Sequence, residues 1–158
     1  MDERIDLLTS LLGQSEEYQG KNAPFSDISA TVDEIHEEIC ITSNLTLSFI
    51  PENQMKCKKL VITNATVELS NLDLLGTIVV NRGILILKNC HIHDPLPSSD
   101  YLITSQDISF VTAENCLLEN APHFGICVDN RSTIQLTGCT IQNIHLFGIV
   151  ITSSSIFR

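Results

Sequence analysis

The sequence has few aromatic residues and few basic ones. Aromatic residues make up 5% of its 158 residues, Trp is absent, and 9 Lys and Arg stand against 19 Asp and Glu, for a net charge of −10. Nucleic-acid binding normally requires a basic face. The only basic cluster is Lys56, Lys58 and Lys59, which we interpret as a solvated loop. We therefore predict no nucleic-acid partner.

Targeting and metal motifs are also missing. No apolar run approaches the length of a membrane span, and residues 1–13 lack the basic start and apolar stretch of a signal peptide. The 6 cysteines show no paired spacing such as Cys-x-x-Cys. These absences predict a cytoplasmic chain with reduced cysteines, no membrane partner and no cofactor.

The chain does contain a repeat. Ile, Leu and Val dominate the apolar content, alongside many Thr and Asn, which favours strands and tight turns. Similar dipeptides recur at spacings of 25, 26 and 23 residues between short apolar strands: Asn64-Ala65, Asn89-Cys90, Asn115-Cys116 and Gly138-Cys139. A sharp bend needs a residue at positive φ, where Asn and Gly are the least strained occupants. We interpret these dipeptides as one stacked corner.

Each repeat has room for three strands in about 20–26 residues, which is typical of one coil of a parallel β-helix. Strand alternation then points Cys90, Cys116 and Cys139 inward as a ladder, with Ala65 one coil earlier. Residues 3–12 are expected to form an amphipathic helix. The sequence thus predicts a helical cap and linker over residues 1–24 and a β-helix over residues 25–158 whose last coil is incomplete.

Three segments carry a family resemblance: residues 32–50 (VDEIHEEICITSNLTLSFI), 76–94 (GTIVVNRGILILKNCHIHD) and 125–143 (GICVDNRSTIQLTGCTIQN). They resemble the repeats of the pectin-lyase-like superfamily, and are most similar to the carbohydrate-binding and sugar-hydrolase repeats of eukaryotic F-box and SHC-binding β-helix proteins. The resemblance covers residues 32–158 and implies a right-handed winding with glycan or protein binding. The expected fold is an all-β, right-handed parallel β-helix of about four to five coils with an N-terminal amphipathic helical cap.

Chemistry-bearing residues gather at strand ends. Asp107 and Asp129 are the weak candidates for the two carboxylates of glycoside hydrolysis, without an accompanying triad or His motif. Corner residues that suit a carboxylate or phosphate ligand are Arg82, Asn130 and Arg131.

A weak candidate metal pair is formed by His91 and His93, about 7 Å apart along one outer face, with Glu114 or Glu119 as further donors. Plain surface is the favoured interpretation of this pair. Phe124 and Phe147 are expected to stack inside, with a sugar-stacking platform as the alternative.

The C-terminal coil forms an apolar edge of Ile149, Ile151, Ile156 and Phe157. This edge predicts either a fragment of a longer solenoid or end-to-end self-association. Without a convergent catalytic constellation, the preferred function is a non-catalytic binding or scaffold module that recognises a protein or glycan along an outer face. The alternatives are a carbohydrate-active enzyme, hydrolase or lyase, and a self-assembling structural solenoid.

Overall fold

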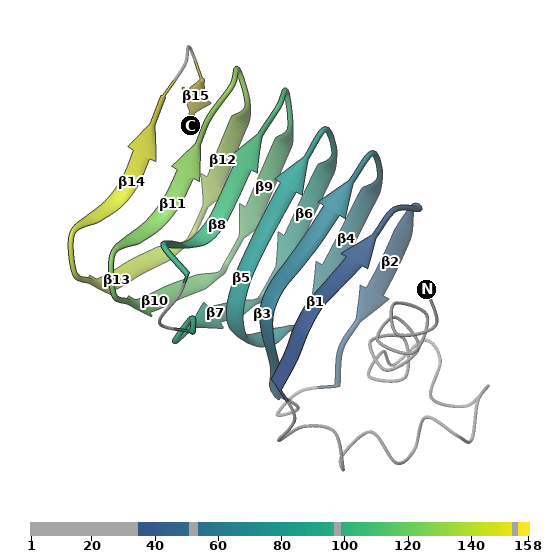
Figure 1. Ribbon diagram of the computed structural model, residues 1–158, viewed down its shortest axis with the longest axis horizontal. Helices are drawn as coiled ribbons and strands as arrows, with labels where there is room; N and C mark the ends of the chain where they lie inside the picture. Colours follow the sequence, from purple (N-terminus) through teal and green to yellow (C-terminus); the bar gives the residue numbers. More distant parts are fainter. Residues whose placement is uncertain (1–34, 51–53, 97–98, 153–154) are drawn as a thin grey trace.

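The chain forms a parallel β-solenoid of about five turns, whose coils follow one another in sequence order (Figure 1). The structure is a computed structural model that describes residues 35–50, 54–96, 99–152 and 155–158. All regular secondary structure in those ranges is β-strand. The described residues contain no helix that is long and apolar enough to cross a membrane. The predicted helical cap, residues 1–24, lies outside the described residues.

Fifteen strands lie within the described residues. They are β1 (Ile35–Ile41), β2 (Leu45–Ser48), β3 (Gln54–Thr63), β4 (Thr66–Ser70), β5 (Asp73–Asn81), β6 (Ile84–Lys88), β7 (His91–His93), β8 (Tyr101–Gln106), β9 (Phe110–Glu114), β10 (Leu117–Ala121), β11 (Phe124–Val128), β12 (Thr133–Thr137), β13 (Thr140–Ile144), β14 (Phe147–Ile151) and β15 (Ile156–Phe157).

These strands form two parallel sheets. The 6-stranded sheet has the order β15-β12-β9-β6-β4-β2. In the 9-stranded sheet, β5 pairs with β7 through Asp73–Leu75 and with β8 through Ile78–Asn81. The later coils therefore have the three strands that the repeat predicts. In the earlier coils, two of those strands are fused into the long β3 and β5.

The hydrogen-bond register corrects the predicted corner of Asn64 and Ala65. The nitrogen of Asn71 donates to the carbonyl of Lys88, and that of Asn89 donates to the carbonyl of Glu114, so Asn71 is level with Asn89 in the corner column. Leu72 accordingly precedes Cys90, Cys116 and Cys139 in the inward column, in place of Ala65. The positive φ predicted for all four corner residues is confirmed, at 50° for Asn64, 54° for Asn89, 53° for Asn115 and 62° for Gly138.

Asn64 belongs to a different corner, which follows the ends of β3, β5, β8 and β11 and which we call the arginine corner because it carries Arg82 and Arg131. The nitrogen of Ile84 donates to the carbonyl of Ala65, so Ala65 is level with Gly83. Ser109 and Ser132 continue this small-residue column and are buried. The Ser109 hydroxyl accepts a hydrogen bond from the Gly83 nitrogen at 3.2 Å, and the Ser132 hydroxyl accepts one from the Ser109 nitrogen at 3.0 Å. Buried hydroxyls thus satisfy backbone donors where the chain turns.

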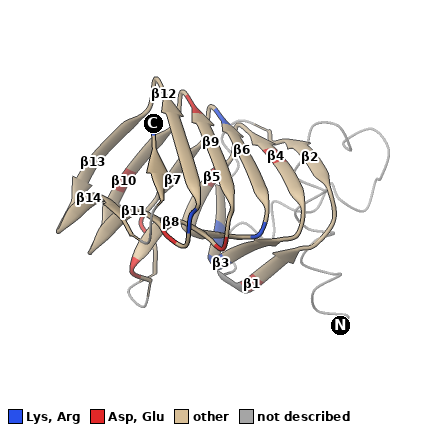
Figure 2. Cartoon of the chain, turned by 90° about the horizontal axis from the view of Figure 1, so that it is seen from above, with Lys and Arg blue, Asp and Glu red and all other residues tan. Residues whose placement is uncertain are grey.

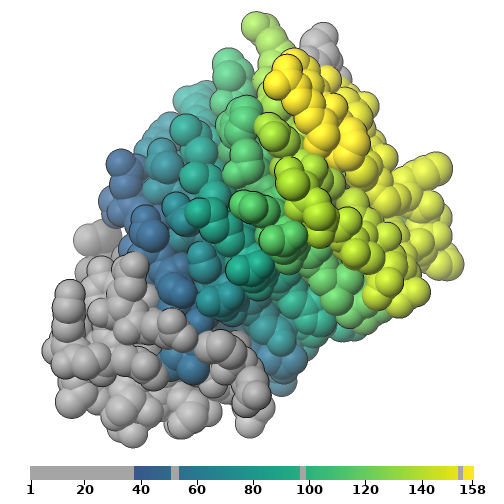
Figure 3. All heavy atoms as spheres, turned by 180° about the vertical axis from the view of Figure 1, so that it is seen from behind, coloured from purple at the N-terminus to yellow at the C-terminus, as the bar shows by residue number. Residues whose placement is uncertain are grey.

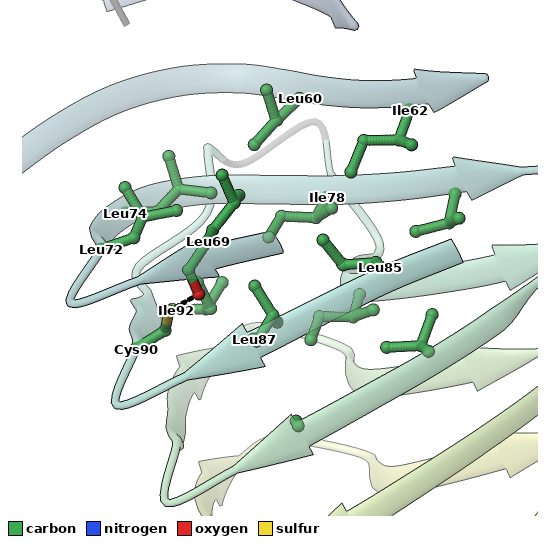
Figure 4. Packing of buried hydrophobic residues seen from close by; sticks show 14 of the residues in the cluster. Leu60, Ile62, Leu69, Leu72, Leu74, Ile78, Leu85, Leu87, Cys90 and Ile92 are labelled. Atoms are coloured by element: carbon green, nitrogen blue, oxygen red, sulfur yellow. Dashed lines mark hydrogen bonds between the residues drawn. The ribbon is translucent and has the colours of Figure 1, made fainter. Parts of the chain in front are cut away.

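The interior is filled by aliphatic columns that run from coil to coil (Figure 4). Leu69 and Leu87 pair in register and are completely buried, as are Leu60 and Ile78. Removing one such side chain from water contributes roughly 1.5–3 kcal/mol. The Cys90 thiol lies at the end of this interior and donates to the Leu69 carbonyl at 3.4 Å. The core therefore fixes which strand faces point outward and can carry function.

Charged positions are scattered over the described part of the solenoid and form no continuous band of either sign (Figure 2). The space-filling view shows the coils stacked side by side, with the last coil at one end (Figure 3). Function must therefore be sought in local clusters.

Candidate functional site

The arginine corner carries a hollow of about 600 Å³ on its outer side. It is lined by Arg82, Asp107, Ile108, Asn130 and Arg131. The three corner residues proposed from sequence for ligand binding, Arg82, Asn130 and Arg131, thus lie around one depression, because equivalent positions of successive coils stack.

Backbone geometry explains how this hollow is held. Two consecutive residues of each later coil have left-handed φ angles, 56° and 59° at Asp107 and Ile108, and 51° and 60° at Asn130 and Arg131. The nitrogen of Ile108 donates to the carbonyl of Asn130 at 3.0 Å. The Asn130 side-chain amide donates to the Asp107 carboxylate, also at 3.0 Å. Adjacent coils are therefore bonded to each other through both backbone and side chain.

Ile108 is the residue that sequence reasoning missed. Its side chain is 73% exposed, although it is a large aliphatic group. A β-branched residue at φ 59° is a true conformational outlier, because Cβ crowds the following carbonyl. The available signal was the alignment of Ile108 with Arg131, which puts an apolar residue at an exposed corner position.

A second hollow of about 450 Å³ continues along the same corner and shares Arg82 and Ile108 with the first. Its other lining residues are Asn44, Asn64, Ala65, Thr66, Gly83 and Ile84. The two hollows form an elongated surface that crosses several coils. Within the described ranges, no ion pair involves either Arg82 or Arg131, so both guanidinium groups are available to a ligand.

The two candidate catalytic carboxylates, Asp107 and Asp129, accept hydrogen bonds from residues of the turns at this corner. Asp107 accepts from Asn130, as described above. The Asp129 carboxylate accepts from the Asn130 nitrogen at 2.8 Å and from the Thr152 hydroxyl at 2.5 Å. Val128 pairs with Ser105, which puts Asp129 level with Gln106 and not with Asp107. Catalysis by this pair remains a sequence prediction.

The basic cluster is not the loop expected from sequence, because Lys56, Lys58 and Lys59 lie within strand β3. Cys57, between them, is buried, but the consecutive Lys58 and Lys59 are not, because the register with β5 is irregular between Cys57 and Leu60. A groove of about 480 Å³ crosses the outer face of the sheet beside this cluster. It is lined by Glu38, Lys58, Lys59, Thr77, Val79, Ser99, Asp100, Tyr101, Thr104 and Gln106. Its charges are mixed, with two lysines beside two carboxylates.

A histidine–carboxylate cluster occupies the outer face of β5, β7 and β10. The His91 and His93 rings stack with centroids 3.8 Å apart, closer than their spacing along the strand suggests. The Asp73 carboxylate lies 2.6 Å from His93 Nε2 and 3.9 Å from His91 Nδ1. Of the two donors proposed from sequence, Glu119 contacts His91 Nε2 at 2.9 Å, whereas Glu114 pairs in register with Lys88 on the other sheet.

Further carboxylates surround these rings. Asp94 Oδ2 lies 2.6 Å from His93 Nδ1, and the His93 side chain is 9% exposed. Burial opposes ionisation of Asp94, but hydrogen bonds from His93 and Asn120 outweigh it and lower the pKa of its carboxyl. Hydrogen bonds from Gln142 and His91 lower the pKa of the Glu119 carboxyl as well. The cluster therefore keeps a high density of negative charge.

The predicted aromatic ladder exists, but it is not part of the core. Phe124 stacks on Phe147 at a centroid distance of 6.0 Å, and on Tyr101 at 5.1 Å. Phe147 is 63% exposed and Phe124 is half-buried, so the expectation of interior stacking was wrong. Burial raises the pKa of the Tyr101 hydroxyl, and the nearby Cys127 and Asp129 add to this rise.

The predicted assembly edge forms the last described coil. Strand β15 pairs with β12, and its Ile156 and Phe157 are exposed, as is Ile151, whereas Ile149 packs partly against the core. End-to-end association through this edge stays a prediction.

Comparison with known proteins identifies the fold family. No curated protein and no solved structure matches the chain, so the resemblance to F-box and SHC-binding β-helix proteins stays a prediction. The family described as a right-handed β-helix region matches residues 31–157, about four fifths of the sequence. Together with the parallel two-sheet winding, this match shows that the chain belongs to the right-handed β-helix family.

Proposed function

We propose that the chain is a non-catalytic binding module that recognises an acidic segment of a protein partner along the arginine corner. The observation that carries the proposal is Ile108, an exposed apolar side chain held at left-handed φ between Arg82 and Arg131. Right-handed β-helices serve both binding and enzymatic roles, so the function is argued from this site and not from the fold.

The strain at Ile108 supports a role outside folding. A left-handed conformation costs an ordinary residue about 1–2 kcal/mol, whereas Asn or Gly would adopt it with less strain. An exposed side chain recovers little of that cost through burial. Strained residues that contribute little to packing concentrate at functional sites.

Arg and a large apolar side chain together suit a protein interface. Interface energy concentrates in a few anchors, in which Arg is enriched, and a ring of contacts excludes water from them. Arg82 and Arg131 belong to corner positions two coils apart, a separation of about 9.6 Å at the strand spacing. Carboxylates three residues apart in a polyproline II segment lie on the same face and are separated by about 9.3 Å. A segment with Asp or Glu at positions i and i+3 and an apolar residue between them therefore fits the corner.

Protein is favoured over glycan because of the aromatic geometry. Sugar recognition through stacking requires an accessible ring face. Tyr101, Phe124 and Phe147 stack in that order, so both faces of the central ring are occupied and the exposed Phe147 offers one outer face rather than an extended platform.

The test is a selection of displayed random peptides on the immobilised chain, with the double variant Ile108→Asn/Arg131→Ala as the counter-target. Peptides with the acidic spacing i, i+3 are expected to be enriched on the wild-type chain. Ile108→Asn, Arg131→Ala and Arg82→Ala, each made singly, are expected to weaken the binding of these peptides at least tenfold. Lys88→Gln is the matched control, because Lys88 is a basic residue of the other sheet that pairs with Glu68 at 3.0 Å. It should leave binding unchanged.

Two outcomes would contradict the proposal. Equal binding of the selected peptides to the wild-type chain and to the double variant would show that the arginine corner does not recognise them. Screening the same proteins on a glycan array distinguishes the other partner class: a specific acidic-glycan signal that disappears in Arg82→Ala and Arg131→Ala would replace protein by glycan.

A further inference from the structure

We propose that Asp73, His91 and His93 form a binding site for one divalent transition-metal ion, of which Zn²⁺ is the best representative. The site lies on the outer face of the 9-stranded sheet and is independent of the arginine corner. The potential ligand atoms of these three residues all lie within 4.8 Å of one another.

The first argument is a proton count at His93. Its Nδ1 lies 2.6 Å from Asp94 Oδ2 and its Nε2 lies 2.6 Å from Asp73 Oδ1. A neutral imidazole has one N–H and one lone pair, whereas an ionised carboxylate only accepts. If one ring nitrogen carries the N–H and donates it to its carboxylate, the lone pair of the other nitrogen faces the second carboxylate. A metal ion between His93 and Asp73 would let both the ring nitrogen and the carboxylate act as ligands.

The second argument is that each candidate ligand is held from behind. Asp94 contacts the far nitrogen of His93, and Glu119 contacts the far nitrogen of His91 at 2.9 Å. The Gln54 amide donates to the second oxygen of Asp73 at 3.3 Å. Metal-binding histidines characteristically donate their other N–H to a carboxylate, which fixes the tautomer and orients the ring. Here, both histidines have that support.

The third argument is distance. In a tetrahedral zinc site, with bonds of about 2.0–2.2 Å, neighbouring ligand atoms are about 3.3–3.5 Å apart. The two Asp73 distances, 2.6 Å to His93 and 3.9 Å to His91, lie on either side of that value. The stacked rings must tilt, since an ion lies in the plane of each ring that binds it. His91 has a 33% exposed side chain and is the ring with room to turn.

The donor set selects the class of metal. Two imidazoles and one carboxylate suit Zn²⁺ and other divalent transition metals, whereas Ca²⁺ and Mg²⁺ prefer oxygen alone. The surrounding carboxylates Asp73, Asp94 and Glu119 favour a double positive charge. Three protein ligands leave a fourth position for water.

The experiment is calorimetric titration of the metal-stripped full-length chain with ZnCl₂, with CaCl₂ as the comparison. One Zn²⁺ per chain is expected, with a dissociation constant in the micromolar range or tighter, and no response to Ca²⁺. Asp73→Asn, His91→Gln and His93→Gln should each weaken binding at least tenfold. Glu119→Gln, a positioning variant, should also weaken it by about tenfold. His123→Gln is the matched control, because His123 faces Asp100 at 3.3 Å outside the cluster, and it should bind as the wild-type chain does.

Histidine NMR of the wild-type chain keeps the test independent of variant folding. Zn²⁺ should shift only the His91 and His93 resonances. Absence of zinc binding would overturn the proposal. Binding that survives in the double variant His91→Gln/His93→Gln and disappears after alkylation of the thiols would assign the metal to cysteine, and would overturn it too.

Discussion

Replacing Ile108 with Asn should stabilise the fold while it weakens partner binding. The left-handed backbone at φ 59° costs a β-branched residue about 1–2 kcal/mol, and Asn adopts it more readily. Complete burial of an Ile is worth roughly 1.5–3 kcal/mol, but the side chain is 73% exposed, so only about a quarter of that is lost. The expected net change is a gain of about 1 kcal/mol in the free energy of unfolding. That gain corresponds to a rise of about 2–4 °C in Tm for a chain of this size.

Urea unfolding followed by circular dichroism measures the change. Ile84→Asn is the matched control: Ile84 is 41% exposed in strand β6 and lacks positive φ. There the same substitution loses apolar contact and relieves no strain, so stability should fall by about 1 kcal/mol. If Ile108→Asn destabilises the chain as much as Ile84→Asn does, the strain argument fails, and with it the main support for the arginine corner as a binding site.

Two further predictions concern the neighbouring coils around strand β3. Gly76→Ala should lower the free energy of unfolding by several kcal/mol, because a Cβ there would lie 1.8 Å from the Cys57 carbonyl oxygen. At Gly148 the atom nearest to an added Cβ is an ordinary 3.6 Å away, so Gly148→Ala should change the urea midpoint little. Similar effects at both positions would contradict the expected clash. Burial raises the pKa of the Cys57 thiol from 9.0 to about 11. The unfolded chain therefore loses this proton first, and the contribution of Cys57 to stability is complete below pH 9 and falls by about 2–3 kcal/mol as the pH rises to 11. Cys57→Ala should flatten that alkaline decline in the free energy of unfolding, and an unchanged slope would show that the thiol is not responsible.

The repeat predicted the solenoid because two constraints recur in every coil. Strand alternation points one set of apolar residues inward, and the corner needs a residue that tolerates positive φ. The later coils satisfy both with the same dipeptide, so Asn89, Asn115 and Gly138 were placed in the right column. In the earlier coils the corresponding pair is Asn71 and Leu72, separated from Asn89 by 18 residues. Leu fills the inward position as well as Cys does, so the dipeptide match failed there and selected Asn64 from the other corner.

Sites were predictable to the extent that they depend on register. Arg82 and Arg131 share one hollow because the corners of successive coils stack, although Arg82 is level with Asp107 and Arg131 is level with Ile108. Ile108 was missed because residue preference argues against a β-branched side chain at positive φ. For the histidines, the sequence search considered donors on the following coil, whereas Asp73 comes from the preceding one. That contact depends on the fused strand β5, which the repeat pattern did not reveal.

The corner ladder also limits how recognition can change. A residue of one coil is bonded through its backbone to its equivalents above and below, so no single substitution can slide Arg131 relative to Arg82 along the axis. Only the gain or loss of a whole coil can alter their separation, and each coil contributes about 4.8 Å. The solenoid therefore allows only fixed separations between corner residues, in steps of one coil. Related chains that use this corner should differ in the length of acidic segment they accept by discrete steps, each close to one and a half residues of extended peptide.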